Sequence, residues 1–469
     1  MHVDQHGLEL TAASEAAVGH YNRAVHELLH FREGCIDEAR AAVAEDPAFP
    51  MGMTLRAYLR LLTSDAEDAA ALRAWWPGYR AGAGANGTTP RERMHHASVD
   101  AWLAGDIKGA GSVLGELVHA YPRDALALAV GHQIDFFTAD AVSLRDRVGG
   151  ALTSWSEDDE HLGPILGMYA FGLEEAGHYD RSEDIGLRAV ELDRKDVWGI
   201  HAVVHTYEMQ GRFGDGIRFF DDRRDDWAGG NFFNVHNWWH YCLYCLEAGR
   251  VDRALEIYDA VLHNEQSEPV ALEMLDAAAL LWRLYLEGDD SPGERWRALA
   301  DAWEPKMEPP FYSFNDMHAV MSYVGAGELG RAEALVASRE RYLAEAHPGV
   351  TNHWMTARVG LPVCRAILAF GRGDYGQTVD LLSPIRAHVN DFGGSHAQRD
   401  AVQRTLLEAT LRAGRNDLAR ALVSERIGVK PSSPYNWLKE AQLARQLGDA
   451  AAAATAQARA QDLVTSVDL

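Results

Sequence analysis

Apolar residues recur along most of this chain with the three-to-four-residue period of an amphipathic α-helix. Two such groups are Leu187, Val190 and Leu192, and Ala254, Leu255, Tyr258 and Leu262. No sustained period-two alternation bounded by turn residues is present, so strands are not expected. The pattern predicts an all-α protein.

One phrase repeats along these helices: a short helix, a glycine beside a polar residue, and a second amphipathic helix. The glycines of this phrase are Gly105, Gly177, Gly211, Gly249, Gly327, Gly371, Gly414 and Gly448. Two of the intervals are 34 residues (211−177 and 448−414), and the 72 residues from Gly105 to Gly177 leave room for two units. A period near 34 with a left-handed glycine between paired helices is typical of tetratricopeptide repeats. We therefore predict a tetratricopeptide-like α-solenoid, with helix–turn–helix repeats wound into a superhelix.

We expect one solenoid domain over residues 1–469. It comprises N-terminal helices at 1–80, repeats at 90–425 and C-terminal capping helices at 426–469, where the stretch 450–460 is rich in alanine. The glycine-rich stretch 82–90 lacks the Lys-Ser/Thr ending of a phosphate-binding loop, and no strand precedes it. We interpret it as an inter-helix connection.

Histidines recur at similar places in the first helices of several repeats. His201, His205 and Glu208 have the spacing i, i+4, i+7, which puts them on one helical face. His240 lies nine residues before its repeat glycine, and we assign candidate catalytic roles to His201, His205, Glu208 and His240. The candidate ligand-binding residues are His236, Asn237, Trp238, Trp239, Trp198, His318 and His96. We expect these side chains to line the concave face of the solenoid.

Such a face suits a small molecule better than a peptide, because it offers imidazoles, indoles and a carboxylate but few basic clamps. A histidine near its ordinary pKa of about 6.5 exchanges protons at neutral pH, so proton-transfer chemistry is the hypothesis. We assign no cofactor. A metal ion held by His201, His205, Glu208 and His236 or His240 stays an alternative, since His-x-x-x-His on a helix can hold one ion. Two further alternatives are a scaffold that binds a partner peptide and histidines that only fill the core.

Composition excludes several classes. Lys and Arg number 44 against 69 Asp and Glu, a net charge of −25, which argues against nucleic-acid or anionic-membrane partners. The N-terminus lacks an apolar signal region, so we expect a cytoplasmic protein. Four cysteines are too few for a disulfide framework, and Cys242 and Cys245 fall within a helical pattern, which favours buried thiols over a redox or metal pair. A homodimer is compatible with the acidic, aromatic-rich chain, but the sequence does not place its interface.

Several longer motifs resemble those of the tetratricopeptide repeat protein 38 family. They include Trp198-Gly-Ile-His-Ala-Val-Val-His205 continuing through Glu208 to Arg212, His236-Asn-Trp-Trp-His240, and Asp316-Met-His-Ala-Val-Met321. The resemblance covers roughly residues 15–425 and implies a helical-repeat fold. The resemblance implies no particular reaction. Its most distinctive motifs contain the same histidines that recur at similar places in the repeats.

Overall fold

The computed structural model describes residues 2–82 and 88–467, and nearly all of its regular structure is helical. The N-terminal part holds β1 (His2–Val3), β2 (Glu9–Leu10), α1 (Glu15–Leu29), α2 (Gly34–Glu45), α3 (Pro50–Leu61), α4 (Ala66–Arg73) and α5 (Trp76–Ala81). The next helices are α6 (Pro90–Leu103), α7 (Ile107–Ala120), α8 (Ala125–Phe137), α9 (Ala141–Ala151), α10 (Leu162–Glu175), α11 (Tyr179–Leu192), α12 (Val197–Gln210), α13 (Phe213–Asp222) and α14 (Arg224–Trp227).

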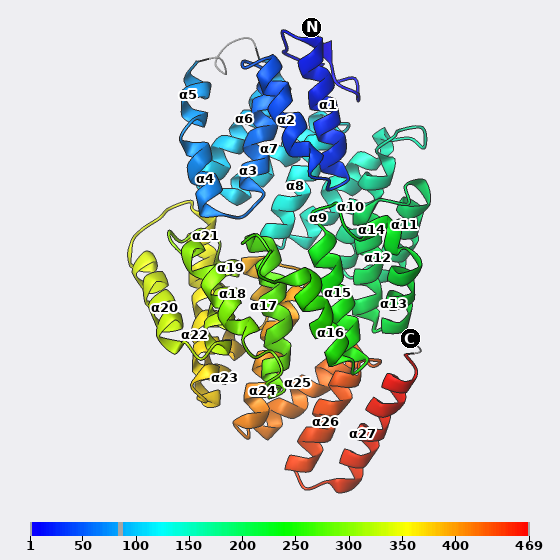
Figure 1. Cartoon of the computed structure of the whole chain (residues 1–469), viewed down its shortest axis with the longest axis vertical. Helices are drawn as coiled ribbons and strands as arrows, with labels where there is room; N and C mark the ends of the chain where they lie inside the picture. The colour runs from blue at the N-terminus through cyan, green and yellow to red at the C-terminus, as the bar shows by residue number, and fades with distance from the viewer. Residues whose placement is uncertain (1, 83–87, 468–469) are drawn as a thin grey trace.

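The second half begins with α15 (Asn234–Glu247), α16 (Val251–Ile257), α17 (Ala271–Leu286), α18 (Arg295–Trp303), α19 (Ser313–Gly325), α20 (Leu329–Ala344) and α21 (Thr351–Met355). It ends with α22 (Leu361–Gly371), α23 (Tyr375–Leu382), α24 (His396–Arg412), α25 (Asn416–Val429), α26 (Pro434–Gln446) and α27 (Ala450–Thr465). Consecutive helices pack in pairs, and the pairs stack along the molecule (Figure 1). The predicted all-α, tetratricopeptide-like solenoid is confirmed.

Left-handed turns join the two helices of the pairs, as the glycine register predicts. Gly211, for example, has φ 71° and ends α12, where Arg212 N–H donates to the carbonyl of Tyr207. The 72-residue gap after Gly105 does hold two units, because α8 and α9 form a pair whose turn contains Ala139 at φ 44°. One position requires correction: Gly371 ends α22, and the left-handed turn falls on Gly373, at φ 76°.

Two elements fall outside the predicted pattern. β1 and β2 form a small antiparallel hairpin in which His2 pairs with Leu10, and strands of two residues are too short to show a period. Most of the predicted 82–90 connection, residues 83–87, lies outside the described residues. Within residues 2–82 and 88–467, no helix combines the length and apolar character that a bilayer span needs.

The superhelix is wound tightly enough for distant repeats to touch. α24 packs against both α12 and α17, and Trp282 Nε1–H of α17 donates to Thr405 Oγ1 of α24 at 2.8 Å. Arg283, also on α17, donates to the carbonyl of Ala397 at 2.7 Å. Inner helices from the middle and the end of the chain therefore face one another across a narrow interior.

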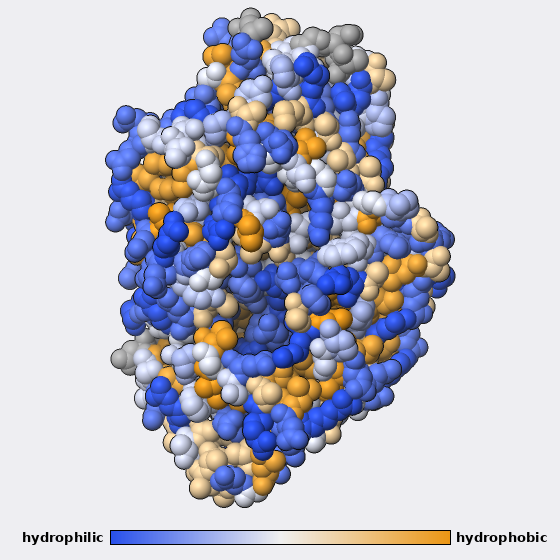
Figure 2. All heavy atoms as spheres, turned by 180° about the vertical axis from the view of Figure 1, so that it is seen from behind, coloured by the Kyte–Doolittle hydropathy of each residue, from blue (hydrophilic) through white to orange (hydrophobic). Residues whose placement is uncertain are grey.

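The rear surface is hydrophilic and hollowed below its middle (Figure 2).

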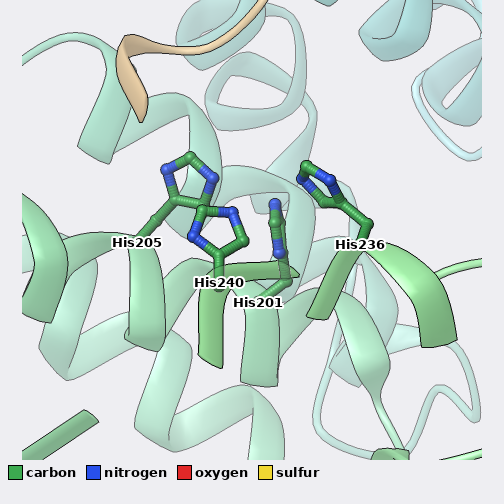
Figure 3. Close-up of side chains that lie close together, drawn as sticks. All are labelled: His201, His205, His236 and His240. Carbon is green, nitrogen blue, oxygen red and sulfur yellow. The ribbon is translucent and has the colours of Figure 1, made fainter. Parts of the chain in front are cut away.

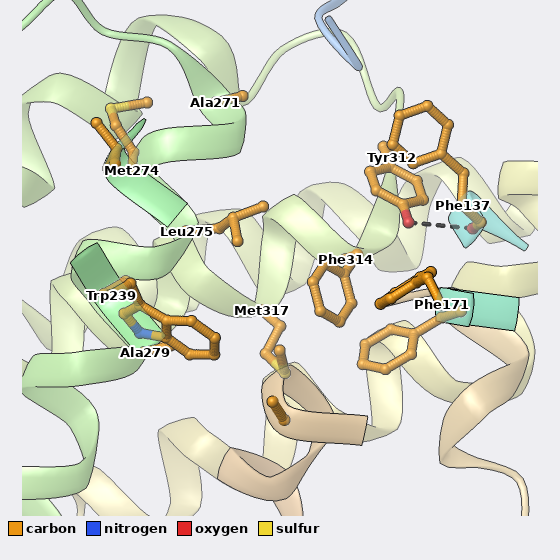
Figure 4. Close-up of a cluster of buried hydrophobic side chains, with 14 of the residues drawn as sticks. Phe137, Phe171, Trp239, Ala271, Met274, Leu275, Ala279, Tyr312, Phe314 and Met317 are labelled. Carbon is orange, nitrogen blue, oxygen red and sulfur yellow. Dashed lines mark hydrogen bonds between the residues drawn. The ribbon is translucent and has the colours of Figure 1, made fainter. Parts of the chain in front are cut away.

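Buried aromatic side chains fill the region where α8, α10, α15, α17 and α19 meet (Figure 4). Phe137 and Phe171 lie against the Tyr312–Phe314 segment, and Tyr312 O–H donates to the carbonyl of Phe137 at 3.0 Å. Burying each large side chain of this kind contributes roughly 1.5–3 kcal/mol to stability. This core fixes the inner helices that carry the candidate site.

Candidate metal centre

Two His-x-x-x-His pairs face each other across adjacent inner helices. His201 and His205 lie on α12, and His236 and His240 follow them on α15 by 35 residues each (236−201 and 240−205), one repeat later. Because residues four apart share a helical face, each helix presents two imidazoles to the other. One ring nitrogen from each of the four histidines lies within 4.8 Å of the others (Figure 3). The closest ring centroids, those of His205 and His240, are 4.3 Å apart.

The four rings differ in exposure. His201, His205 and His240 are buried, whereas the His236 side chain is 16% exposed. Three of the four imidazoles are therefore shielded from solvent, and the group reaches solvent at His236. Four ligand nitrogens within 4.8 Å of one another could surround a single ion, whereas drug-sized ligands occupy cavities of about 300–1,000 Å³.

Each histidine turns Nδ1 toward a polar acceptor. His236 Nδ1 lies 2.6 Å from Asp276 Oδ2 of α17, and His240 Nδ1 lies 2.8 Å from Glu208 Oε2 of α12. His201 Nδ1 lies 3.1 Å from Asn237 Oδ1. His205 Nδ1 is 3.4 Å from Glu174 Oε2 of α10.

These partners determine which ring nitrogen is free. A carboxylate or amide oxygen only accepts, so Nδ1 of His201, His236 and His240 carries the proton and Nε2 presents its lone pair. His205 Nδ1 faces Glu174 without a hydrogen bond. The Nε2 atoms of His205 and His240 are buried, and no described residue hydrogen-bonds to them. Histidines that bind metals in proteins are held in this way, with the far ring N–H on a carboxylate or carbonyl.

Electrostatics keeps part of the group uncharged. Burial and the neighbouring imidazoles lower the pKa values of His201 and His240 well below the ordinary value. Burial also disfavours the His205 cation, but the Glu174 carboxylate offsets this and raises the pKa of His205. Neutral imidazoles are the form that binds metal ions.

The geometry suits a single transition-metal ion. Nitrogens bound to Zn²⁺ at about 2.0 Å lie about 3.3 Å from one another in a tetrahedron, so shifts of about 1 Å would close the observed set. The nearby carboxylates Asp276, Glu208 and Glu174 supply negative charge that offsets a divalent cation, although Lys430 Nζ also lies 3.9 Å from Glu208 Oε1. The residues of this group are therefore of the types that such an ion prefers as ligands.

The structure brings most of the predicted site residues together. His201, His205, His236 and His240 form the group, and Glu208 and Asn237 hold two of the rings in place. The Trp239 ring stacks on His236 with centroids 5.3 Å apart, and the Trp198 ring lies 5.6 Å from His201. Glu208 thus stands behind His240 instead of within the imidazole group.

Three other predicted residues lie elsewhere. Trp238 packs on Trp227, because two residues beyond His236 a side chain points to the far side of the helix. His96 lies in α6 beside Tyr79. His318 in α19 directs Nδ1–H to the carbonyl of Phe314.

Asp276 and Glu174 were not predicted from the sequence. Each lies on a different inner helix from the histidine it contacts. Glu174 falls within residues 170–179, a stretch that shares the family resemblance, but no spacing in the sequence links it to His205. The one available signal is an acidic residue within an otherwise apolar helix, as in the segment Met274-Leu-Asp-Ala-Ala-Ala279. Such a residue is costly to bury without a partner.

A second histidine group near the N-terminus has a different character. His26 Nδ1 lies 3.0 Å from His161 Nε2, and His161 Nδ1 lies 3.0 Å from His6 Nε2. Its ring nitrogens therefore satisfy one another and link the N-terminal hairpin to α1 and the start of α10. The cysteines also have structural surroundings: all four are buried and unpaired, and burial raises the pKa of Cys242 well above its ordinary value. The prediction of buried thiols agrees with this placement.

No family model matches the chain. Among solved structures, it is similar to the human IFIT1 dimer with PPP-AAAA, at 12% identity over 79% of this chain and 90% of that one, with a TM-score of 0.35. It is similar to a chain of the APC/C hetero-tetramer Cut9-Hcn1, at 11% identity over 97% of this chain and 97% of that one, with a TM-score of 0.36. It is also similar to the P58(IPK) TPR domain, at 12% identity over 81% of this chain and 96% of that one, with a TM-score of 0.22. Nothing about the site follows from similarities of this size, and the fold rests on the helix pairs described above.

Proposed function

We propose that this protein binds one late first-row divalent metal ion through Nε2 of His201, His205, His236 and His240. The observation that carries the proposal is the arrangement of the four rings, each with one nitrogen within 4.8 Å of the other three. Three of them have Nδ1 on a hydrogen-bond acceptor, and His205 Nδ1 faces Glu174. Leaving a buried lone pair unmatched costs about 1–3 kcal/mol. An ion would satisfy the buried Nε2 atoms of His205 and His240, which no described residue hydrogen-bonds.

An all-imidazole ligand set selects among ions. Imidazole suits Zn²⁺, Cu²⁺, Ni²⁺ and Fe²⁺, whereas Mg²⁺ and Ca²⁺ prefer oxygen ligands. Compared with the sequence-based alternative, His236 takes the place of Glu208, which instead accepts from His240. The carboxylate raises the basicity of the imidazole that it contacts and fixes its orientation.

The small-molecule hypothesis takes a more specific form at this site. A ligand would reach the ion on the side of His236, whose side chain alone among the four is more than slightly exposed. The ligand proposed on that side is a small anion or a water molecule. Any proton transfer would then depend on this open side.

We also propose that the chain belongs to the tetratricopeptide repeat protein 38 family. The two motifs most distinctive of that family, residues 198–212 and 236–240, form the two facing walls of the histidine group. A shared ligand would explain why these motifs differ from generic repeats.

Metal analysis of the purified full-length chain tests the proposal. We expect bound metal in the wild type and a higher melting temperature when Zn²⁺ is added back to chelator-treated protein, because ligand binding stabilises by RT ln(1 + [L]/Kd). His236→Asn should lose one equivalent of metal, and its partial exposure makes folding tolerant of the change. His119→Asn, on the exposed side of α7, is the matched control and should keep it. A His236→Asn protein with unchanged metal content and unchanged response to Zn²⁺ would refute the proposal.

A further inference from the structure

Glu174 on α10 is a fully buried carboxylate, and neither of its oxygens accepts a hydrogen bond from the described residues. Its two imidazole neighbours are ion-pair partners that make no hydrogen bond to it: Oε2 is 3.4 Å from His205 Nδ1, and Oε1 is 3.7 Å from His396 Nδ1. Burying a carboxylate whose oxygens accept no hydrogen bond is costly. The surroundings of Glu174 therefore point to a missing partner.

His396, the first residue of α24, presents a second unsatisfied atom at the same place. Its Nδ1 has no hydrogen-bond partner among the described residues and lies 3.6 Å from Glu175 Oε1. The ligand atoms of Glu174, Glu175 and His396 all lie within 4.8 Å of one another. Two carboxylates and one imidazole thus converge from α10 and α24.

Glu175 is held rigidly in this group. Its Oε1 accepts the backbone N–H of His396 at 2.7 Å, and its Oε2 accepts from Arg399 Nη2 at 3.1 Å. Arg399 offsets the charge of Glu175, and the charge of Glu174 is available to the imidazoles of His205 and His396 or to a bound cation. The contact between α10 and α24 exists because the superhelix brings together residues more than 200 positions apart.

We infer that Glu174, Glu175 and His396 form a second divalent-cation site beside the four-histidine group. The mixed oxygen and nitrogen ligands suit Mn²⁺, Fe²⁺ or Zn²⁺. An ion would enter along His396, whose side chain is 34% exposed. Three protein ligands leave further coordination positions open to water or substrate.

The two sites share one connection. His205 belongs to the imidazole group, and its Nδ1 faces Glu174, so one side chain touches both positions. The second site uses none of the four histidines as a ligand, although Glu174 would serve both positions, as a ligand of one ion and as the carboxylate that faces His205 of the other. If both hold ions, the protein carries a two-cation centre built from α10, α12, α15 and α24.

Titration of chelator-treated full-length protein with Mn²⁺, followed by the electron paramagnetic resonance signal of the free ion, tests the inference. We expect one bound Mn²⁺ in the wild type and an affinity at least about tenfold lower in both Glu174→Gln and His396→Asn. Glu174→Gln preserves the buried shape, and His396→Asn alters a partly exposed residue, so circular dichroism should show both folded. Glu340→Gln on the surface of α20 is the control and should bind Mn²⁺ normally.

The outcomes separate the two sites. His240→Asn should keep Mn²⁺ binding while losing the Zn²⁺ equivalent of the four-histidine group. His396→Asn should lose Mn²⁺ binding while keeping that Zn²⁺ equivalent. No Mn²⁺ binding by the wild type, or binding that both Glu174→Gln and His396→Asn leave unchanged, overturns the inference. Mn²⁺ binding lost in those two variants but without any Zn²⁺ equivalent assigned to His240 would support this site and refute the proposed function.

Discussion

His240 Nδ1 on α15 donates to Glu208 Oε2 on α12 across 2.8 Å, and both side chains are buried. The bond joins two successive repeats and turns the imidazole so that Nε2 faces the other histidines. The same relationship recurs between His236 and Asp276, one repeat further on. Carboxylates on neighbouring inner helices therefore orient the rings of the candidate metal centre.

Removing the charge of Glu208 should weaken metal binding without removing a ligand. Glu208→Gln keeps an oxygen that can accept from His240 but lowers the basicity of the ring, so we expect about 10- to 100-fold lower Zn²⁺ affinity. Competition with a chromophoric chelator measures this. Glu340→Gln, in an exposed ion pair with Arg365, should leave the affinity unchanged. Equal affinities for wild type and Glu208→Gln would contradict the orienting role.

Stability should fall as the pH drops below about 6.5. Burial lowers the pKa of His318 from 6.5 to about 4 and that of His132 to about 3, so the unfolded chain binds more protons than the folded chain in this range. Each of these two histidines should lower the free energy of unfolding by about 2 kcal/mol at pH 5 relative to neutral pH. Urea unfolding of chelator-treated protein between pH 7 and pH 5 measures the slope of the free energy of unfolding against pH.

The slope can be assigned to individual residues. His318→Gln should remove about 2 kcal/mol of the change between pH 7 and pH 5, whatever its effect at neutral pH. His119→Gln replaces an exposed histidine and should leave the slope as it is. An unaltered slope in His318→Gln would show that His318 does not stay neutral in the folded chain.

Ala139 holds a left-handed turn position that glycine holds in most other repeats. Its φ of 44° is unfavourable for a residue with a Cβ atom, so Ala139→Gly should raise the free energy of unfolding by about 0.5–1 kcal/mol. Gly177→Ala should lower it by a similar amount, because φ there is 79° and no neighbouring atom lies within 4 Å of an added Cβ. Ala104→Gly, at φ −73°, should not stabilise the protein. Denaturant unfolding compares the three variants.

Asp316 and Arg339 form a buried two-point ion pair between α19 and α20, with Nε to Oδ2 at 2.9 Å and Nη2 to Oδ1 at 2.7 Å. Asp316→Asn leaves Arg339 with Glu308 Oε1 at 2.9 Å as its remaining carboxylate and should cost about 3 kcal/mol, the lower end for a broken buried pair. Asp301→Asn breaks an exposed pair with Arg331 and should cost less than about 1 kcal/mol. Similar losses in both variants, measured by chemical unfolding, would show that burial does not control this interaction.

Local patterns predicted the helical repeats because they depend on residues close together in the sequence. Gly177 and Gly211 lie one repeat apart, and each ends a helix in the left-handed region. The same locality explains why His201 and His205 could be placed on one face. The error at Gly371 arose because Gly373 lies two residues away, and sequence alone does not tell which glycine adopts the turn.

The sequence by itself determined the repeat architecture and the pairing of histidines four residues apart on α12 and α15. The tertiary structure decided which other groups join them. Asp276, Glu174 and His396 come from α17, α10 and α24, and only the pitch of the superhelix brings these helices together. It also separated His318 and His96 from the group, although their register is similar. Periodicity fixes the direction in which a side chain leaves its helix, whereas the packing of distant helices fixes what that side chain meets.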